Sequence, residues 1–304
     1  MVADQLIARG RSRIVPTLIG FQRRIFRTRL LRYKGDFNIE YLELSPEKKE
    51  TLVFLHGFGD TKDSFLRSAV RLSRHYRVII PDMPGFGETV RDYARTYTLE
   101  NYSQWMAGFI RHFGEKVHLA GNSLGGATAL LVALEARDSL RSLTVIDPAG
   151  IFDENIRCIY DMILEGHNIF SVRNRAEFER LLELVFHRRP KLPDMVFDYM
   201  FHRFLKSRQW HEKLIQDLMH GARVGDDIPD PGLYSLNERI KGIRVPTLVM
   251  WGDRDQIFPV GLAQIAHSGI PGANLHIFSN TGHSVQVEYP GKFVRVFREF
   301  QHSI

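Results

Sequence analysis

Cysteine is nearly absent from this chain of 304 residues. The single Cys158 cannot form an internal disulfide, so nothing in the sequence requires an oxidising compartment. No apolar run approaches the roughly 20 residues that a membrane-spanning helix needs, and internal repeats and low-complexity tracts are missing. What is present, 44% apolar and 25% charged residues, is typical of a globular protein with one large core.

Acidic side chains are scarce in residues 1–36, where nine basic residues face only Asp4 and Asp36. No small-residue cleavage site follows the apolar octet 14–21, so a secretory signal is not predicted and we expect a cytoplasmic protein. Over residues 14–26 the apolar and basic side chains fall on opposite faces of a helix. This pattern predicts that residues 1–36 form a basic amphipathic segment at a membrane surface. The rival interpretation is that the segment packs on the core or on a second subunit.

Strand and helix patterns alternate over residues 37–150 and again over 241–304. Because the strands are apolar throughout, they indicate a mostly parallel sheet with helices on both faces, an α/β fold. Residues 151–240 show no convincing strand and are predicted to form a helical cap inserted into that core. Strands are expected at 37–44, 51–55, 76–81, from 117, and at 140–146, 246–251 and 274–278. Helices are expected at 63–74, 99–113, 127–136, 260–267 and from 290, and in the cap at 175–188, 193–206 and 209–220, followed by a loop at 225–232.

The sequence Gly121-Asn122-Ser123-Leu124-Gly125 has the pattern G-x-S-x-G, with a strand before it and a helical run after it. A serine at such a sharp turn is held in a strained conformation with its Oγ exposed at the carboxyl end of a sheet. The two glycines stand where a Cβ would collide. The N–H of Leu124 would lie at a helix N-terminus, which favours an incoming negative charge. The pattern predicts that Ser123 is a nucleophile; the alternative is an ordinary glycine-rich turn with a solvated serine.

A serine nucleophile needs a base, and the base needs an orienting group. His283 follows a late strand with a glycine turn in front of it, which predicts the base. Asp255 follows the strand 246–251, and the order Ser, Asp, His is that of an α/β-hydrolase triad. Asp253 and Asp147 also follow strands and remain alternatives for the acid. We expect Asp253 instead to shape its turn, and Asp147 to order the start of the cap.

The loop after the strand 51–55 is the expected source of a second donor to the oxyanion that acyl transfer develops. Leu124 N–H is the first donor, and Phe58 N–H is predicted to be the second. His56, in the same loop, is expected to brace the loop rather than to act as a base.

Five segments of the chain resemble the α/β-hydrolase superfamily, in particular monoacylglycerol-lipase-type hydrolase-domain proteins and related bacterial lipases and esterases. The resemblance spans about residues 37–304 and thins through 151–240. It implies Ser123 as nucleophile, Asp255 as acid, His283 as base, Phe58 and Leu124 as oxyanion donors, and neither a metal nor an organic cofactor. The segments that carry it are His56–Gly59, Asp82–Gly87, Gly121–Gly126, Trp251–Asp255 and Gly282–Ser284.

The predicted function is hydrolysis of a carboxylic ester, foremost a monoacylglycerol or a similar medium-chain acyl ester. A small-molecule or lipid partner is expected and a nucleic acid is not; the oligomeric state stays open. Two alternatives remain. One is a carbon–carbon bond hydrolase of ring-fission products, although such enzymes usually have a glycine-richer loop at Phe58 and a tryptophan in place of Ser284. The other is a ligand receptor of the same fold that does not turn over.

Methionines in the cap are candidates for the acyl-binding site. Ligand sites are mainly apolar, and methionine adapts to a flexible chain. Met162, Met195 and Met200 are therefore predicted to line an acyl tunnel, against the plainer interpretation that they pack the cap on the core.

Overall fold

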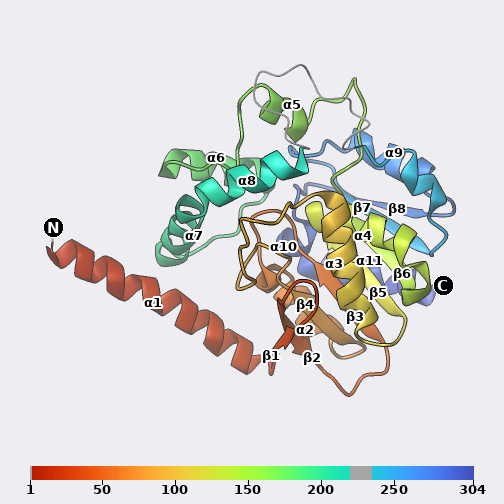
Figure 1. Cartoon of the computed structure of the whole chain (residues 1–304), viewed down its shortest axis with the longest axis horizontal. Coiled ribbons are helices and arrows are strands. Elements are labelled where there is room, and N and C mark those ends of the chain that lie inside the picture. The colour runs from red at the N-terminus through yellow and green to blue at the C-terminus, as the bar shows by residue number, and fades with distance from the viewer. Residues whose placement is uncertain (1, 220–234) are drawn as a thin grey trace.

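An eight-stranded sheet runs through the centre of the computed structural model, which describes residues 2–219 and 235–304, with side chains from Ile14 onward (Figure 1). Its first two strand pairs are antiparallel and the other five are parallel, which confirms the predicted mostly parallel sheet. Across the sheet the strands are β1 (Arg29–Tyr33), β2 (Ile39–Leu44), β4 (Arg77–Pro81), β3 (Thr51–Leu55), β5 (Val117–Asn122), β6 (Leu140–Ile146), β7 (Thr247–Gly252) and β8 (Asn274–Phe278).

Strand β1 is a strand that the sequence pattern did not predict, because it lies within the basic N-terminal segment. It forms the edge of the sheet beside β2, and much of it is exposed. Its basic residues face acidic residues across the ladder: Arg29 lies opposite Glu43, at 3.1 Å, and Arg32 pairs with Glu40. Opposite charges on neighbouring strands stabilise such a pairing.

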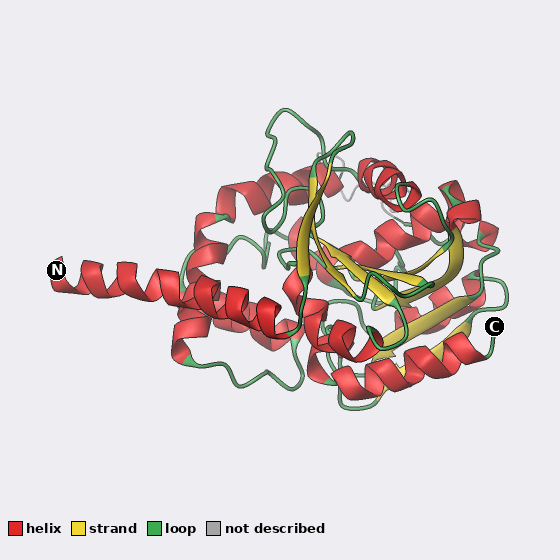
Figure 2. Ribbon diagram, turned by 90° about the horizontal axis from the view of Figure 1, so that it is seen from below, coloured by secondary structure: helices red, strands yellow, loops and turns green. Residues whose placement is uncertain are grey.

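Helices cover both faces of the sheet, as the apolar strands predicted (Figure 2). One face packs on α3 (Leu99–Arg111), α4 (Leu124–Glu135) and α9 (Gly261–Gly269). The other packs on α2 (Leu66–Leu72) and α11 (Pro290–His302). Helix α4 is apolar almost all round and nearly all of it is buried, which is typical of a helix inside a core. The turn at its start is therefore held firmly in place.

Among the described residues, four helices between β6 and β7 lie over the carboxyl ends of the parallel strands (Figure 1). Helices α6, α7 and α8 correspond to the three helices predicted for the cap, whereas α5 was not expected. The end of the third predicted helix, at residue 220, and the predicted loop 225–232 lie outside the described residues. The four helices are α5 (Ile159–Leu164), α6 (Arg175–Val185), α7 (Asp194–Lys206) and α8 (Arg208–Leu218), and α6 and α7 share an aromatic cluster around Phe178, Phe197 and Phe204.

Helix α1 (Val2–Ile25) projects from the body of the molecule in both ribbon views (Figures 1 and 2). Its C-terminal end is held by Arg23, whose guanidinium donates to Asp63 at 2.7 and 2.9 Å and to Glu88 at 3.1 Å. None of the helices in the described part of the chain combines the length and the apolar character needed to cross a bilayer. The remaining elements of residues 2–219 and 235–304 are α10 (Val285–Glu288) and three 3₁₀ turns at Lys62–Phe65, Arg137–Ser139 and Arg239–Gly242.

Candidate active site

Ser123 is the single residue between the end of β5 and the start of α4. Its backbone conformation is one that residues other than glycine rarely adopt. Its φ is 56° and its ψ is −119°. The glycines around it allow the close packing of this turn, as predicted. A Cβ on Gly121 would lie 2.2 Å from the carbonyl oxygen of Gly125, and a Cβ on Gly125 would lie 2.3 Å from that of Leu55. Strain of this kind is maintained only where the surrounding structure fixes it, and it often marks a functional site.

Asp255 and His283 form a buried pair beyond the ends of β7 and β8. Nδ1 of His283 lies 2.7 Å from Oδ2 of Asp255. The other carboxylate oxygen accepts hydrogen bonds from the N–H groups of Ile257 and Phe258, at 2.7 and 3.0 Å. Both side chains of the pair are almost fully buried. The loop after Asp255 thus holds the carboxylate inward, and the carboxylate fixes the orientation of the imidazole.

Asn122 connects the serine turn to the histidine loop. Its Nδ2 donates to the carbonyl oxygens of His283 and Ile146, at 3.1 Å each, and its Oδ1 accepts from Gln286 at 3.1 Å. This positions the chain next to Ser123 against the chain that contains His283. The sequence analysis missed this role, because Asn122 occupies a variable position of G-x-S-x-G and nothing in the pattern marks it.

The sequence analysis expected Asp147 to order the start of the cap. In the structure its side chain turns toward β7 instead. Its Oδ1 accepts from the N–H of Gly252 at 2.8 Å, and its φ of 45° turns the chain at the end of β6. Burial, and then the nearby charge of Asp255, raise the pKa of Asp147 well above its usual range. This shift favours the protonated form of the carboxyl group. Asp253, which was expected to shape its own turn, instead joins two loops: its Oδ1 accepts from the N–H of Thr281, in the loop after β8, at 3.2 Å.

Asp147, Asp255 and His283 each offer one atom to a group that lies within 4.8 Å, close enough to hold a metal ion. Their hydrogen bonds argue for another use. Both oxygens of Asp255 already accept hydrogen bonds, Nδ1 of His283 is bonded to one of them, and the raised pKa of Asp147 favours its uncharged form. The arrangement favours proton transfer over metal binding.

The loop after β3 lies directly on Ser123. A Cβ on Gly57 would be 3.2 Å from the Cβ of Ser123, and Phe58 follows at the next position. Leu124 is the first residue of α4, where an N–H has no partner within the helix. His56 braces this loop as predicted: its Nδ1 donates to the carbonyl oxygen of Gly57 at 2.8 Å, and its Nε2 accepts from Met83 N–H at 3.0 Å. Burial lowers the pKa of His56, so the ring is neutral.

An apolar pocket opens at Ser123, but the three predicted cap methionines are not part of its lining. Met162 packs on the main core and Met200 on the aromatic cluster of the cap, while Met195 lies half-buried on α7. Composition indicated an apolar cap, but not which side chains face the serine. Besides Phe58, Ser123 and Leu124, the lining comprises Leu99, Ala149, Ile159, Tyr160, Ile163, Phe170, Ile215, Leu218, Met219, Ile257 and Phe258.

Comparison with known proteins agrees with this geometry. The alpha/beta hydrolase family matches residues 52–296, most of the chain. The chain belongs to the α/β-hydrolase family. This confirms the family resemblance and the fold that the sequence motifs indicated.

Several relatives of this α/β hydrolase are lipases. Lipase 1 of Psychrobacter immobilis is 28% identical over 273 residues, which cover 84% of this chain and 82% of that protein. Monoacylglycerol lipase abhd6-B of Xenopus laevis is 27% identical over 269 residues, covering 85% and 77% respectively. Among solved structures, that of a membrane phospholipase A, described as a novel bacterial virulence factor, has a TM-score of 0.89 at 28% identity and covers 99% of this chain and 94% of its own.

Proposed function

We propose that this α/β hydrolase cleaves monoacylglycerols and similar medium-chain acyl esters through an acyl-enzyme on Ser123. The coarser statement, that the chain is a carboxylic ester hydrolase, follows from its family and its lipase relatives. The observation that supports the mechanism best is the 2.7 Å contact between His283 Nδ1 and Asp255 Oδ2, next to a serine on a strained turn.

In the proposed mechanism His283 takes the hydroxyl proton as Ser123 Oγ attacks the ester carbonyl. The oxyanion is met by the N–H groups of Phe58 and Leu124, each worth about 10²-fold or more in rate. His283 then returns the proton to the leaving alcohol and activates the water that cleaves the acyl-enzyme. Asp255 stays ionised throughout and stabilises the imidazolium.

The apolar pocket supports an acyl ester as substrate. Its side chains come from the core and from the proposed cap, residues 151–240, and they surround Ser123. Burial of apolar surface stabilises an acyl chain by roughly 0.8 kcal/mol for each methylene. We therefore place the acyl chain among the pocket residues of α5 and α8, such as Ile163 and Ile215, rather than beside the predicted methionines.

The experiment is steady-state hydrolysis of a glycerol ester series from butyryl to palmitoyl, with a p-nitrophenyl ester and a ring-fission dienoate beside it. We expect many turnovers per enzyme on the glycerol esters, with a preference for medium chains. A single stoichiometric release without turnover would indicate a receptor. Turnover of the dienoate alone would indicate a carbon–carbon bond hydrolase.

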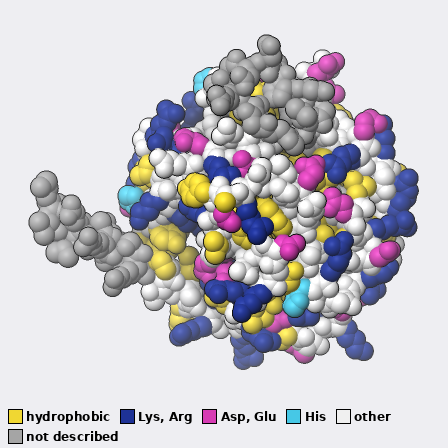
Figure 3. Space-filling view, viewed as in Figure 1, with side chains coloured by type: hydrophobic (Ala, Val, Ile, Leu, Met, Phe, Trp, Pro, Cys, Tyr) yellow, Lys and Arg dark blue, Asp and Glu magenta, His cyan; other side chains and the backbone are white. Residues whose placement is uncertain are grey.

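We also infer that α1 attaches the enzyme to a membrane surface. Four apolar side chains, spaced as on one helical face, are exposed there: Ile14, Leu18, Phe21 and Ile25, at 45%, 48%, 61% and 59%. In the space-filling view hydrophobic side chains gather where α1 meets the body (Figure 3). A helix of this kind lies in the interface with its apolar face in the acyl region. Each basic residue near anionic headgroups adds about 1 kcal/mol.

Flotation with anionic liposomes tests this attachment. Removal of residues 1–33 would also remove β1 and the ion pairs of Arg23, so substitution is the cleaner change. We expect the four exposed residues of α1, all changed to Ser, to abolish flotation of the full chain. The control is the double variant Ile277→Ser, Ile304→Ser, which changes exposed apolar residues elsewhere. It should float like wild type, and high salt should weaken the flotation of both proteins. Undiminished flotation of the α1 variant would contradict the membrane proposal.

A further inference from the structure

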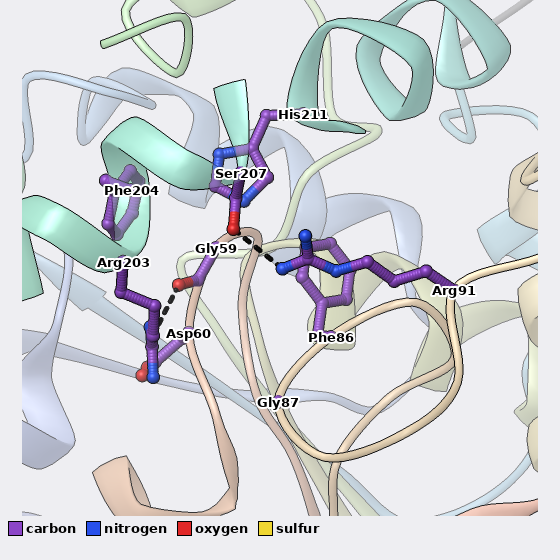
Figure 4. A pocket seen from close by; sticks show the side chains of 9 residues that line it. All are labelled: Gly59, Asp60, Phe86, Gly87, Arg91, Arg203, Phe204, Ser207 and His211. Atoms are coloured by element: carbon purple, nitrogen blue, oxygen red, sulfur yellow. Dashed lines mark hydrogen bonds between the residues drawn. The ribbon is translucent and has the colours of Figure 1, made fainter. Parts of the chain in front are cut away.

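A second cavity lies next to the loop that covers Ser123 (Figure 4). The ring of Phe58 lines the apolar pocket beside Phe170, and it also contacts Phe86 and His211, which line the second cavity. The second cavity has about 70 Å³ of space. A single water needs roughly 10–15 Å³ on this measure, so several waters or one small ion fit.

Two arginines from different elements border this cavity. Arg91, on the loop between β4 and α3, donates from Nη2 to Ser207 Oγ at 2.6 Å. Arg203, on α7, donates from Nη2 to the carbonyl oxygen of Gly59 at 3.0 Å. Among the described residues neither guanidinium has a carboxylate partner in an ion pair. Each arginine therefore retains several unused N–H donors.

The remaining titratable groups of the cavity are Asp60 and His211, and neither forms an ion pair with the two arginines among the described residues. Asp60 is the one carboxyl among the lining residues; burial raises its pKa, the charge of Arg203 opposes this shift, and its Oδ1 accepts from the N–H of Thr61 at 2.8 Å. Burial, followed by the charges of Arg91 and Arg203, lowers the pKa of His211 to about 4, so this ring is neutral. Burial and the charge of Arg203 also lower the pKa of Arg91. Two guanidiniums thus border one cavity, and within the described residues neither is ion-paired with a carboxylate.

Phosphate suits this arrangement better than other common anions. The guanidinium fork matches phosphate and carboxylate oxygens in pairs. Guanidiniums that approach from two elements can each bind a different edge of a tetrahedral phosphate, whereas a carboxylate has only two oxygens to share. The position is also suitable, since Gly59 is two residues beyond Gly57, which touches Ser123, and two residues span at most about 7 Å.

We propose that Arg91 and Arg203 bind a phosphate group, foremost that of an acyl ester substrate whose alcohol part is phosphorylated. This inference rests on the proposed ester hydrolysis. With the ester at Ser123 and the acyl chain in the apolar pocket, the alcohol part of the substrate extends past Phe58 toward the two arginines. Free inorganic phosphate has the same chemistry and is the second possible source of the group.

The first arm of the test compares kcat/KM for a lysophosphatidate with that for a monoacylglycerol of the same acyl chain. The variants are Arg91→Gln, Arg203→Gln and the conservative Arg203→Lys. The control is Lys206→Gln, which removes the same charge from an exposed position on the same helix. We expect the ratio of the two kcat/KM values to fall at least about tenfold in each glutamine variant, to recover in part in Arg203→Lys, and to stay at the wild-type value in the control.

The second arm measures binding of inorganic phosphate to the same proteins by calorimetry. Binding that is lost in both glutamine variants, together with a fallen ratio, assigns the site to a substrate phosphate. The same loss with an unchanged ratio assigns it to free phosphate. An unchanged ratio without phosphate binding overturns the inference and leaves the arginines as links between cap and core. If no ester is turned over at all, the proposed function fails, while the calorimetry still reports on the site.

Discussion

At the scale of single residues, the site depends on how two neighbouring carboxyl groups divide their roles. Asp255 accepts two backbone hydrogen bonds and holds His283, which stabilises its charge. Asp147 accepts a single backbone hydrogen bond, from Gly252, and burial and the charge of Asp255 raise its pKa, which favours its protonated form. One group is thus the charged orienter of the histidine, and the other is a neutral neighbour.

Amide substitutions distinguish the two roles. Asp255→Asn should lower kcat by about 10⁴-fold, because an amide holds the histidine in the wrong tautomer. Asp147→Asn keeps a neutral donor at its position, so its kcat should fall less than about tenfold. Steady-state hydrolysis of a soluble ester measures both. If Asp147→Asn proves the more damaging change, Asp147 rather than Asp255 is the acid.

Asp147→Asn should also change the dependence of stability on pH. In the unfolded chain Asp147 loses its proton near pH 4, whereas the folded protein retains it up to the raised pKa. Wild-type stability therefore falls as pH rises through that range, and the variant lacks this loss. Urea unfolding at a series of pH values should show that the free energy of unfolding of the variant, relative to that of wild type, rises from acid to neutral pH. A constant difference would mean that Asp147 ionises in the folded state.

The sequence predicted those candidate site residues that stand in a recognisable pattern. Ser123 was found through its two glycines, and His283 and Asp255 through their positions after late strands. The bond from Asn122 to His283 could not be predicted, because it joins loops more than 150 residues apart and an asparagine in a turn is common. The sequence also could not predict which apolar side chains of the cap face Ser123. Helical periodicity identifies the apolar face of a helix but not the surface on which that face packs.

At the scale of elements, the histidine loop is joined to the proposed cap. The N–H of His283 donates to the carbonyl oxygen of Val185, the last residue of α6, at 2.9 Å. The carboxylate of Glu288, at the end of α10, accepts from the N–H groups of Gly282, His187 and Arg188 at 2.8, 3.2 and 2.8 Å. The end of α6 and the loop that holds the imidazole are thus bonded to the same residue.

Glu288→Ala removes the acceptor for three N–H groups at once. Hydrogen bonds to a charged group contribute about 1.5–3 kcal/mol, so we expect the free energy of unfolding to fall by about 2 kcal/mol or more, and kcat to fall as His283 loses its fixed position. Urea unfolding and ester hydrolysis measure the two effects. Glu238→Ala is the matched control, because Glu238 is an exposed surface glutamate and should change stability by less than about 0.5 kcal/mol. Equal effects of the two substitutions would contradict this linkage.

Elements were predictable where their pattern was long. The buried strands of the sheet and the helices α6, α7 and α8 follow from apolar runs and helical periodicity. The five-residue β1 and the six-residue α5 are too short for periodicity to reveal. Strand β1 is paired with β2, and ion pairs join the two strands. Such pairing depends on a partner strand, which the sequence of one short segment does not reveal.

At the scale of the whole molecule, buried neutral histidines make the fold sensitive to acid. His118 lies inside β5 with its Nδ1 2.8 Å from Ser142 Oγ. Burial, and then the charge of Arg141, lower its pKa from 6.5 to about 4. Between these values the unfolded chain binds a proton that the folded protein excludes, so stability is lost as pH falls from about 6.5 to about 4.

His118→Gln should make that loss shallower. The substitution is expected to lower stability at pH 7, yet the decline toward pH 4 should be smaller than in wild type, by up to about 3 kcal/mol. Urea unfolding of both proteins across this pH range measures how steeply the free energy of unfolding depends on pH in each. Because the other titrating groups are the same in both proteins, the difference between the two slopes reports on His118. Identical slopes would show that His118 is protonated in the folded protein.

The central claim is that Ser123 forms the acyl-enzyme, and covalent labelling tests it most directly. Wild type treated with a fluorophosphonate should gain the mass of one adduct and lose all ester turnover. Peptide mapping should place this adduct on the peptide that contains Ser123. Ser123→Ala should gain no adduct and show no turnover above background. An adduct on another residue, or a Ser123→Ala variant that still turns over the ester, would contradict the account.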